Sequence, residues 1–152
     1  MQRRTLLVAL TLLTGLAMPQ PLFADDAPDK TVRYRHKAMD ALGSHMGASS
    51  MILKGQVSRE KDLASHARAM DDIAKTLPDL FPKGTQKDSE AKKEIWENWD
   101  DFLAACKTFE EATGALVEAT KKHDLAAAKT AYEKVGSSCG GCHDKFRVED
   151  DH

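Results

Sequence analysis

The chain has 152 residues, which is enough for one hydrophobic core and too few for two ordinary domains. Its 22 basic and 24 acidic residues give a net charge of −2. This weakly acidic balance argues against nucleic acid as a partner.

The first 24 residues have the pattern of a signal peptide. Two arginines precede an apolar run over residues 5–18, which is too short to span a bilayer comfortably, and a proline-containing stretch follows as far as Ala24. The residues before Ala24 fit a cleavage site only loosely, which leaves a retained N-terminal anchor as the alternative. No later segment has the roughly 20 apolar residues of a transmembrane helix. We expect an exported, periplasmic protein without a membrane span, whose single domain covers residues 25–152.

Four segments after the signal peptide carry apolar residues at alternating steps of three and four, the period of an amphipathic helix. Gly55 ends the first segment, Pro78 closes the second, and Ser89 is placed to cap the third after the one long loop. Two short connections and one longer one predict an all-α fold, an antiparallel up-down-up-down four-helix bundle. The predicted helices cover about residues 30–54, 58–77, 89–122 and 125–148.

Cys139, Cys142 and His143 form a CxxCH sequence on the fourth predicted helix. Residues at i, i+3 and i+4 share one face of a helix, so two cysteine sulfurs can form thioether bonds to a c-type haem while the histidine binds the iron. A zinc site would need a second pair of ligands, which Cys106 and the scattered histidines do not form. A redox CxxC of the thioredoxin kind belongs after a strand, and no strand is expected. We therefore predict one covalent haem c per chain, near one end of the bundle.

The position of His143 predicts which residue faces the opposite side of the iron. His143 lies about 10 Å from the end of the fourth helix, at roughly 1.5 Å per residue. In an antiparallel bundle, a residue seven to ten positions into the first helix comes level with the ring. Met39 holds that place and is predicted as a distal contact or sixth ligand, and Met46, one heptad deeper, is the weaker candidate. The alternative is that Met39 only fills the core.

Three further residues are expected near the haem or in the core. Arg35 interrupts the apolar seam of the first helix, and because a buried guanidinium needs an anion, a haem propionate is its predicted partner. Alternatively, Arg35 extends to water near the helix end. Arg147 shares a helix face with His143 and is predicted beside the proximal imidazole or a propionate. Cys106 occupies an apolar seam position and is expected to be a buried free thiol.

A C-terminal CxxCH on the last of four helices resembles the cytochrome c prime family. The supporting stretches, in the order in which the family has them, are residues 32–35, 39–47, 80–82 with 84–85, 94–96 and 139–147. The resemblance implies two behaviours at the iron. Five-coordinate members have an apolar residue at the position of Met39 and bind small gases, whereas in the low-spin branch a methionine there binds the iron and the protein carries electrons. Met39 and its context over residues 43–47 look more like the low-spin branch.

We therefore expect a one-electron carrier that serves redox partner proteins, and not an enzyme, because no acid–base groups are expected over the iron. The alternative is a five-coordinate protein that binds nitric oxide or carbon monoxide. The resemblance also implies a homodimer through the first two helices.

Overall fold

The structure, a computed structural model, describes residues 27–148, and the predicted signal peptide lies outside them. Four long helices dominate the described part, and none of its helices is long and apolar enough to span a membrane. The elements are α1 (Pro28–Leu53), η1 (Glu60–Asp62), α2 (Leu63–Thr76), η2 (Leu77–Leu80), α3 (Glu94–Glu97), α4 (Trp99–Lys121) and α5 (Leu125–Phe146).

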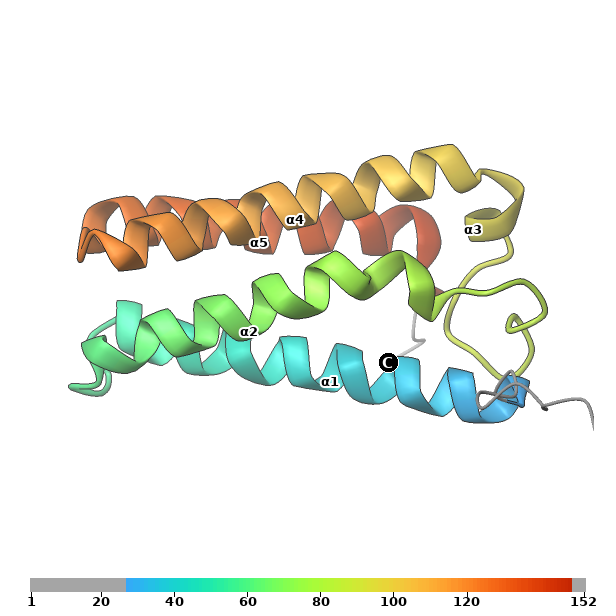
Figure 1. The fold of residues 1–152 in the computed structure, drawn as a ribbon, viewed down its shortest axis with the longest axis horizontal. Helices are drawn as coiled ribbons and strands as arrows, with labels where there is room; N and C mark the ends of the chain where they lie inside the picture. Colours follow the sequence, from blue (N-terminus) through green and yellow to red (C-terminus); the bar gives the residue numbers. More distant parts are fainter. Residues whose placement is uncertain (1–26, 149–152) are drawn as a thin grey trace, which may run out of the picture.

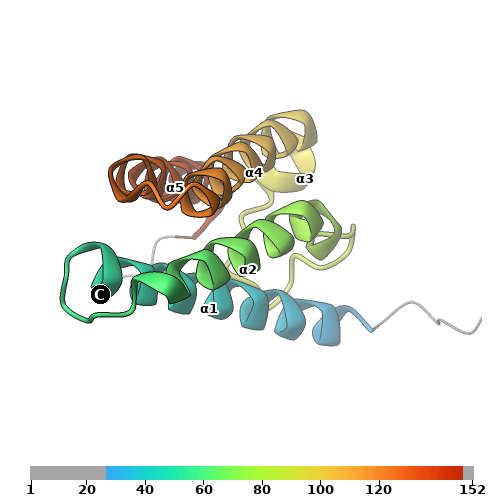
Figure 2. The same cartoon turned by 60° about the vertical axis from the view of Figure 1, so that its left-hand side comes forward.

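The helices run up, down, up and down in two layers, which confirms the predicted bundle. α1 and α2 form one antiparallel pair, α4 and α5 form the other, and the short α3 lies at the end where the chain crosses between the pairs (Figures 1 and 2). Gly55 makes the turn after α1 with a φ of +67°, a conformation that glycine adopts without steric cost. Asp124 begins α5 as its N-cap, because its side chain accepts a hydrogen bond of 2.9 Å from the Ala127 amide.

The prediction of a third helix over residues 89–122 is wrong at its beginning. Residues 89–93 are not helical; α3 is a single turn, and α4 begins only at Trp99 after Asn98, whose φ and ψ of −126° and 54° interrupt the helix. The cause is long-range backbone pairing, because the Lys92 amide donates to the Phe146 carbonyl and the Val148 amide donates to the Glu90 carbonyl, both at 2.8 Å. This pairing also ends α5 at Phe146, two residues before the predicted end.

The remaining boundaries differ less from the predictions. α1 begins and ends within two residues of the predicted range, whereas the segment predicted over 58–77 is divided into the single turn η1, the helix α2 and the turn η2. The core between the two layers is formed by apolar side chains that are almost completely buried, among them Met70, Phe102, Leu116 and Val135. At one end of the bundle this packing opens into a cavity.

Candidate haem site

A cavity of about 870 Å³ separates α1 from α5 and is open to solvent on one side. Its volume lies in the range of sites that bind organic cofactors. Apolar side chains from α1, the η2 turn and the residue after it, α3 and α4 form much of its lining, namely Leu42, Leu77, Phe81, Ile95, Phe102 and Phe109. The cavity is therefore suited to a large flat apolar molecule held between two helices.

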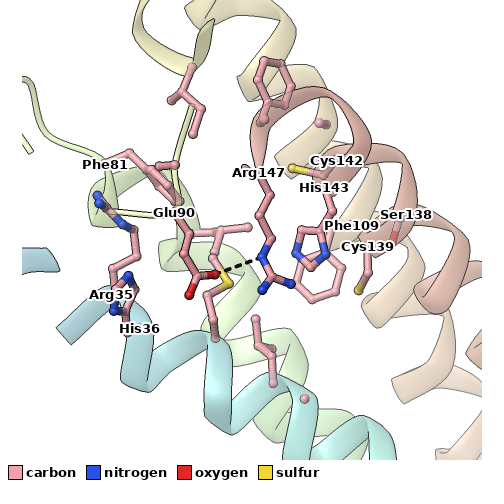
Figure 3. A pocket seen from close by; sticks show the side chains of 18 of the residues that line it. Arg35, His36, Phe81, Glu90, Phe109, Ser138, Cys139, Cys142, His143 and Arg147 are labelled. Carbon is pink, nitrogen blue, oxygen red and sulfur yellow. Dashed lines mark hydrogen bonds and ion pairs between the residues drawn. The ribbon is translucent and has the colours of Figure 1, made fainter. Parts of the chain in front are cut away.

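The structure brings the three CxxCH residues together on the α5 wall of this cavity. Cys139, Cys142 and His143 all line it, and Figure 3 shows their side chains on the same helix, facing the open space. Burial raises the pKa of Cys142 to about 11, and burial also raises the pKa of Cys139. Both are protonated thiols at neutral pH, unlike the activated thiolates of redox or catalytic cysteines. Burial, and after it the charge of Arg147, lower the pKa of His143, which favours the neutral imidazole that binds a metal.

Met39 lines the opposite wall, on α1, as its position in the sequence predicts. Met46 also lines the cavity, but its side chain packs against α5: a Cβ atom placed on Gly136 would lie 3.8 Å from the Met46 methyl group. The Tyr132 hydroxyl donates to the Met46 carbonyl at 3.2 Å and ties the two helices together there. Met39 therefore remains the better candidate for the distal position, and iron ligation by it remains a prediction.

Arg35 is buried, with 2% of its surface exposed, so it does not extend to water. Its guanidinium stacks over Phe81 and donates four hydrogen bonds of 2.6–3.1 Å, all to neutral oxygens. The acceptors are the Leu80 carbonyl, the Thr85 carbonyl and hydroxyl, and the Ser89 hydroxyl. Burial lowers the pKa of Arg35, and no carboxylate of residues 27–148 forms an ion pair with it. A buried cation without a counter-ion therefore lines the cavity, which suits an anionic group on the ligand.

His36 provides a second polar group on the same wall, and sequence reasoning had assigned it no role. Its Nε2 atom is buried without a hydrogen-bond partner, and Figure 3 shows the side chain next to Arg35. A buried polar atom of this kind costs free energy unless a ligand satisfies it. The CxxCH residues, the apolar walls and these two polar groups together fit a haem, and contact between its propionates and Arg35 stays a prediction.

Arg147 lies beside His143, as predicted, and forms an ion pair that the sequence did not indicate. Its Nε atom donates to the Glu90 carboxylate at 2.9 Å, and both residues line the cavity (Figure 3). No spacing rule connects positions 90 and 147, so only the fold could reveal this pair. Whether Arg147 also reaches a propionate remains a prediction.

Cys106 is a buried free thiol, as expected, with 4% of its surface exposed. Burial, followed by the proximity of Cys142, raises its pKa to about 12. Such a thiol stays protonated at neutral pH, unlike the thiolate of a catalytic or metal-binding cysteine.

Comparison with known proteins agrees with this geometry. Residues 30–147 match the family model described as cytochrome c′. The chain is 38% identical over 123 residues to cytochrome c′ of Pararhodospirillum photometricum, which covers 80% of this chain and 98% of that protein. It is also 38% identical over 122 residues to cytochrome c-556 of Agrobacterium fabrum, with 78% and 81% covered. Among solved structures, the nitric oxide complex of a variant of cytochrome c prime from Alcaligenes xylosoxidans superimposes with a TM-score of 0.75 at 27% identity, over 80% of this chain and 97% of that one.

Proposed function

Because the chain belongs to the cytochrome c′ family, whose members bind haem c covalently, we propose that it is a periplasmic one-electron carrier with iron held between His143 and Met39. The observation that carries the proposal is the placement of these two side chains on opposite walls of one cavity, with the attachment cysteines beside His143.

The residues of the chain have separate tasks in this proposal. Cys139 and Cys142 hold the ring by thioether bonds, and His143 supplies a neutral imidazole. The haem iron supplies the one-electron couple when it is bound. Met39 supplies a thioether, a soft and neutral ligand, while the apolar walls exclude water and thereby favour the state with less charge. No acid–base group is needed for these tasks, so we do not propose an enzyme.

Arg35 and His36 are proposed to receive the propionates. The buried cation and the unpaired imidazole nitrogen described above both gain a partner in this way, and the cofactor is oriented with its carboxylates at that end. In this arrangement Arg35→Leu changes the reduction potential of the haem or the pH dependence of that potential. If neither the reduction potential nor its pH dependence changes in this variant, Arg35 does not contact the haem.

Redox partner proteins and a second copy of the chain are the proposed partners. A carrier needs one protein that donates the electron and another that accepts it. A homodimer through α1 and α2 is consistent with the exposed side chains of Tyr34 and Met51 on α1, which are 66% and 45% accessible. Sedimentation of the purified protein at several concentrations tests the dimer.

Gas binding is the second candidate function. Its support is the similarity to a solved nitric oxide complex of a cytochrome c prime variant. If Met39 is only a contact residue, the distal wall is open to a diatomic ligand, and the chain then captures nitric oxide or carbon monoxide in place of carrying electrons.

The optical spectrum of the ferric protein separates the two functions. We expect a low-spin spectrum with a sulfur-to-iron charge-transfer band. The band is lost in Met39→Ala and retained in the control Met46→Ala, because Met46 lies against α5. A high-spin ferric spectrum of the unaltered protein would contradict methionine ligation. Titration with carbon monoxide and nitric oxide then tests the second function directly.

A further inference from the structure

One short segment joins the two arginines that line the haem cavity. We call residues 89–92 the clasp. Its first residue, Ser89, accepts a hydrogen bond of 2.6 Å from Arg35 on the α1 wall. Its second residue, Glu90, binds Arg147 at the end of the α5 wall at 2.9 Å. Adjacent clasp residues thus hold both arginines of the cavity lining.

The main chain of the clasp is fixed against the end of α5. Ala91 pairs with Arg147 in an isolated antiparallel bridge, and hydrogen bonds of 2.8 Å lie on either side of it, between the Lys92 amide and the Phe146 carbonyl and between the Val148 amide and the Glu90 carbonyl. Exposed ion pairs usually contribute little, since two long side chains must be ordered to form them. Here the backbone pairing already places the Glu90 and Arg147 side chains in register, so the ion pair has a defined position.

The position of Arg147 matters because of what lies beside it. Figure 3 shows its guanidinium between the Glu90 carboxylate and the His143 imidazole. With haem bound, His143 would hold the iron, and loss of one electron to a redox partner would add one positive charge next to this imidazole. A nearby guanidinium disfavours that added charge, and a carboxylate paired with the guanidinium compensates for it.

We propose that Glu90 is a positioning residue of the haem site: its carboxylate binds the Arg147 guanidinium from the side away from His143, neutralises it and limits its approach to the imidazole, and so lowers the reduction potential of the haem. This inference rests on the proposed function, in that it concerns the same iron. It assigns a regulatory task to a residue outside the CxxCH motif and 53 positions away from His143 in the sequence.

The test compares Glu90→Gln with a matched control, Glu97→Gln. Both carboxylates are 53% exposed and both are in ion pairs, but Glu97 pairs with Lys93 and does not line the cavity. Spectroelectrochemical titration of the holoprotein should show an upward shift of the midpoint potential in Glu90→Gln and none in Glu97→Gln. Equal potentials in the unaltered protein and Glu90→Gln, with the haem spectrum intact, would overturn the proposal.

A double-mutant cycle separates positioning from a direct effect of the Glu90 charge. The shift caused by Glu90→Gln should be smaller when Arg147 is already replaced by Gln. Equal shifts in both backgrounds would mean that Glu90 acts directly on the iron, and would overturn a role through Arg147. Amide exchange at Lys92 and Val148 gives a structural readout, and we expect it to be unchanged. Faster exchange at both amides would assign any shift to loss of the clasp backbone, which also overturns the proposal.

Failure of this inference and failure of the proposed function are distinguishable. A high-spin spectrum of the unaltered protein contradicts ligation by Met39 but leaves the potential measurable in every variant. An unshifted potential in Glu90→Gln, with a low-spin spectrum, contradicts the task of Glu90 and leaves the electron carrier in place.

Discussion

Replacement of Arg35 by methionine tests how far this buried cation supports the fold. Methionine keeps an unbranched side chain of similar reach but donates no hydrogen bond. The Thr85 hydroxyl still donates to the Pro82 carbonyl, and the Ser89 hydroxyl still accepts from the Ala91 amide. The Leu80 and Thr85 carbonyls lose the donor that Arg35 gave them.

The expected cost follows from those two carbonyls. An unpaired buried carbonyl costs about 1–3 kcal/mol, so two cost about 2–6 kcal/mol. Methionine also avoids the desolvation of a charge, which offsets part of this cost. We therefore expect Arg35→Met to lower the free energy of unfolding by about 3 kcal/mol. With a urea dependence of about 2 kcal/mol per molar, the unfolding midpoint falls by roughly 1.5 M.

Urea unfolding of the holoprotein, followed by circular dichroism, measures this shift. The control is Arg33→Met, because Arg33 lies two residues earlier on α1, is exposed, and forms none of these hydrogen bonds. We expect the control to stay within about 0.5 kcal/mol of the unaltered protein. If the two variants unfold at the same urea concentration, the four hydrogen bonds of Arg35 do not stabilise the fold and the reasoning fails.

Three further predictions concern other parts of the bundle. Thiol titration of the unfolded holoprotein should detect only Cys106, whereas the folded protein should not react at pH 8, because burial raises the pKa of Cys106 to about 12; three thiols after unfolding would show that no haem is attached. The pKa of His45 is lowered by burial and by His66, whose Nδ1 atom is 2.9 Å away, so the unfolded chain binds more protons below about pH 6.5. The free energy of unfolding, measured with urea, should therefore fall between pH 7.5 and 5.5, and should fall less in His45→Gln. An equal fall in both proteins would contradict this. Gly136→Ala should raise the free energy of unfolding by about 1 kcal/mol through helix propensity, and the urea midpoint with it, because the added Cβ would meet the Met46 methyl group at an ordinary 3.8 Å; a lower midpoint would show strain.

Local sequence patterns predicted the helices and the proximal half of the site. The three-four spacing of apolar residues is a property of each helix by itself, and α1, α4 and α5 lie close to where it places them, apart from the first turns of the third segment. The CxxCH motif is equally local, since its three residues share one helix face by spacing alone. The predicted position of Met39 required one further assumption, the antiparallel order of the helices, which the short connections between them indicate.

Contacts between distant segments could not be predicted in this way. Ser89 was expected to begin a helix because it precedes a helical pattern, but its hydroxyl accepts hydrogen bonds from Arg35 and the Ala91 amide. The backbone of residues 90–92 pairs with the end of α5, which no periodicity in either segment indicates. For the same reason the sequence predicted that Arg35 requires partners but gave no indication of the neutral oxygens that it binds.

The cavity itself leads to a final prediction about the dependence of the fold on haem. At about 24 cal/mol per Å³, a dry cavity of about 870 Å³ would cost on the order of 20 kcal/mol, more than the 5–15 kcal/mol that stabilises an ordinary domain. Water entering the open side lowers this cost, but the apolar walls offer water few partners.

A chain without haem should therefore close the cavity or lose fixed packing around it. In the double variant Cys139→Ser and Cys142→Ser, produced in a host that matures c-type cytochromes, we expect helical circular dichroism with a broad thermal transition and binding of an apolar dye. Cys106→Ala is the matched control, because it removes a buried thiol while leaving both attachment sites intact. A sharp transition at the same temperature in the haem-free variant would show that the four helices hold the walls apart by themselves, and that haem fills a site which the bundle maintains without it.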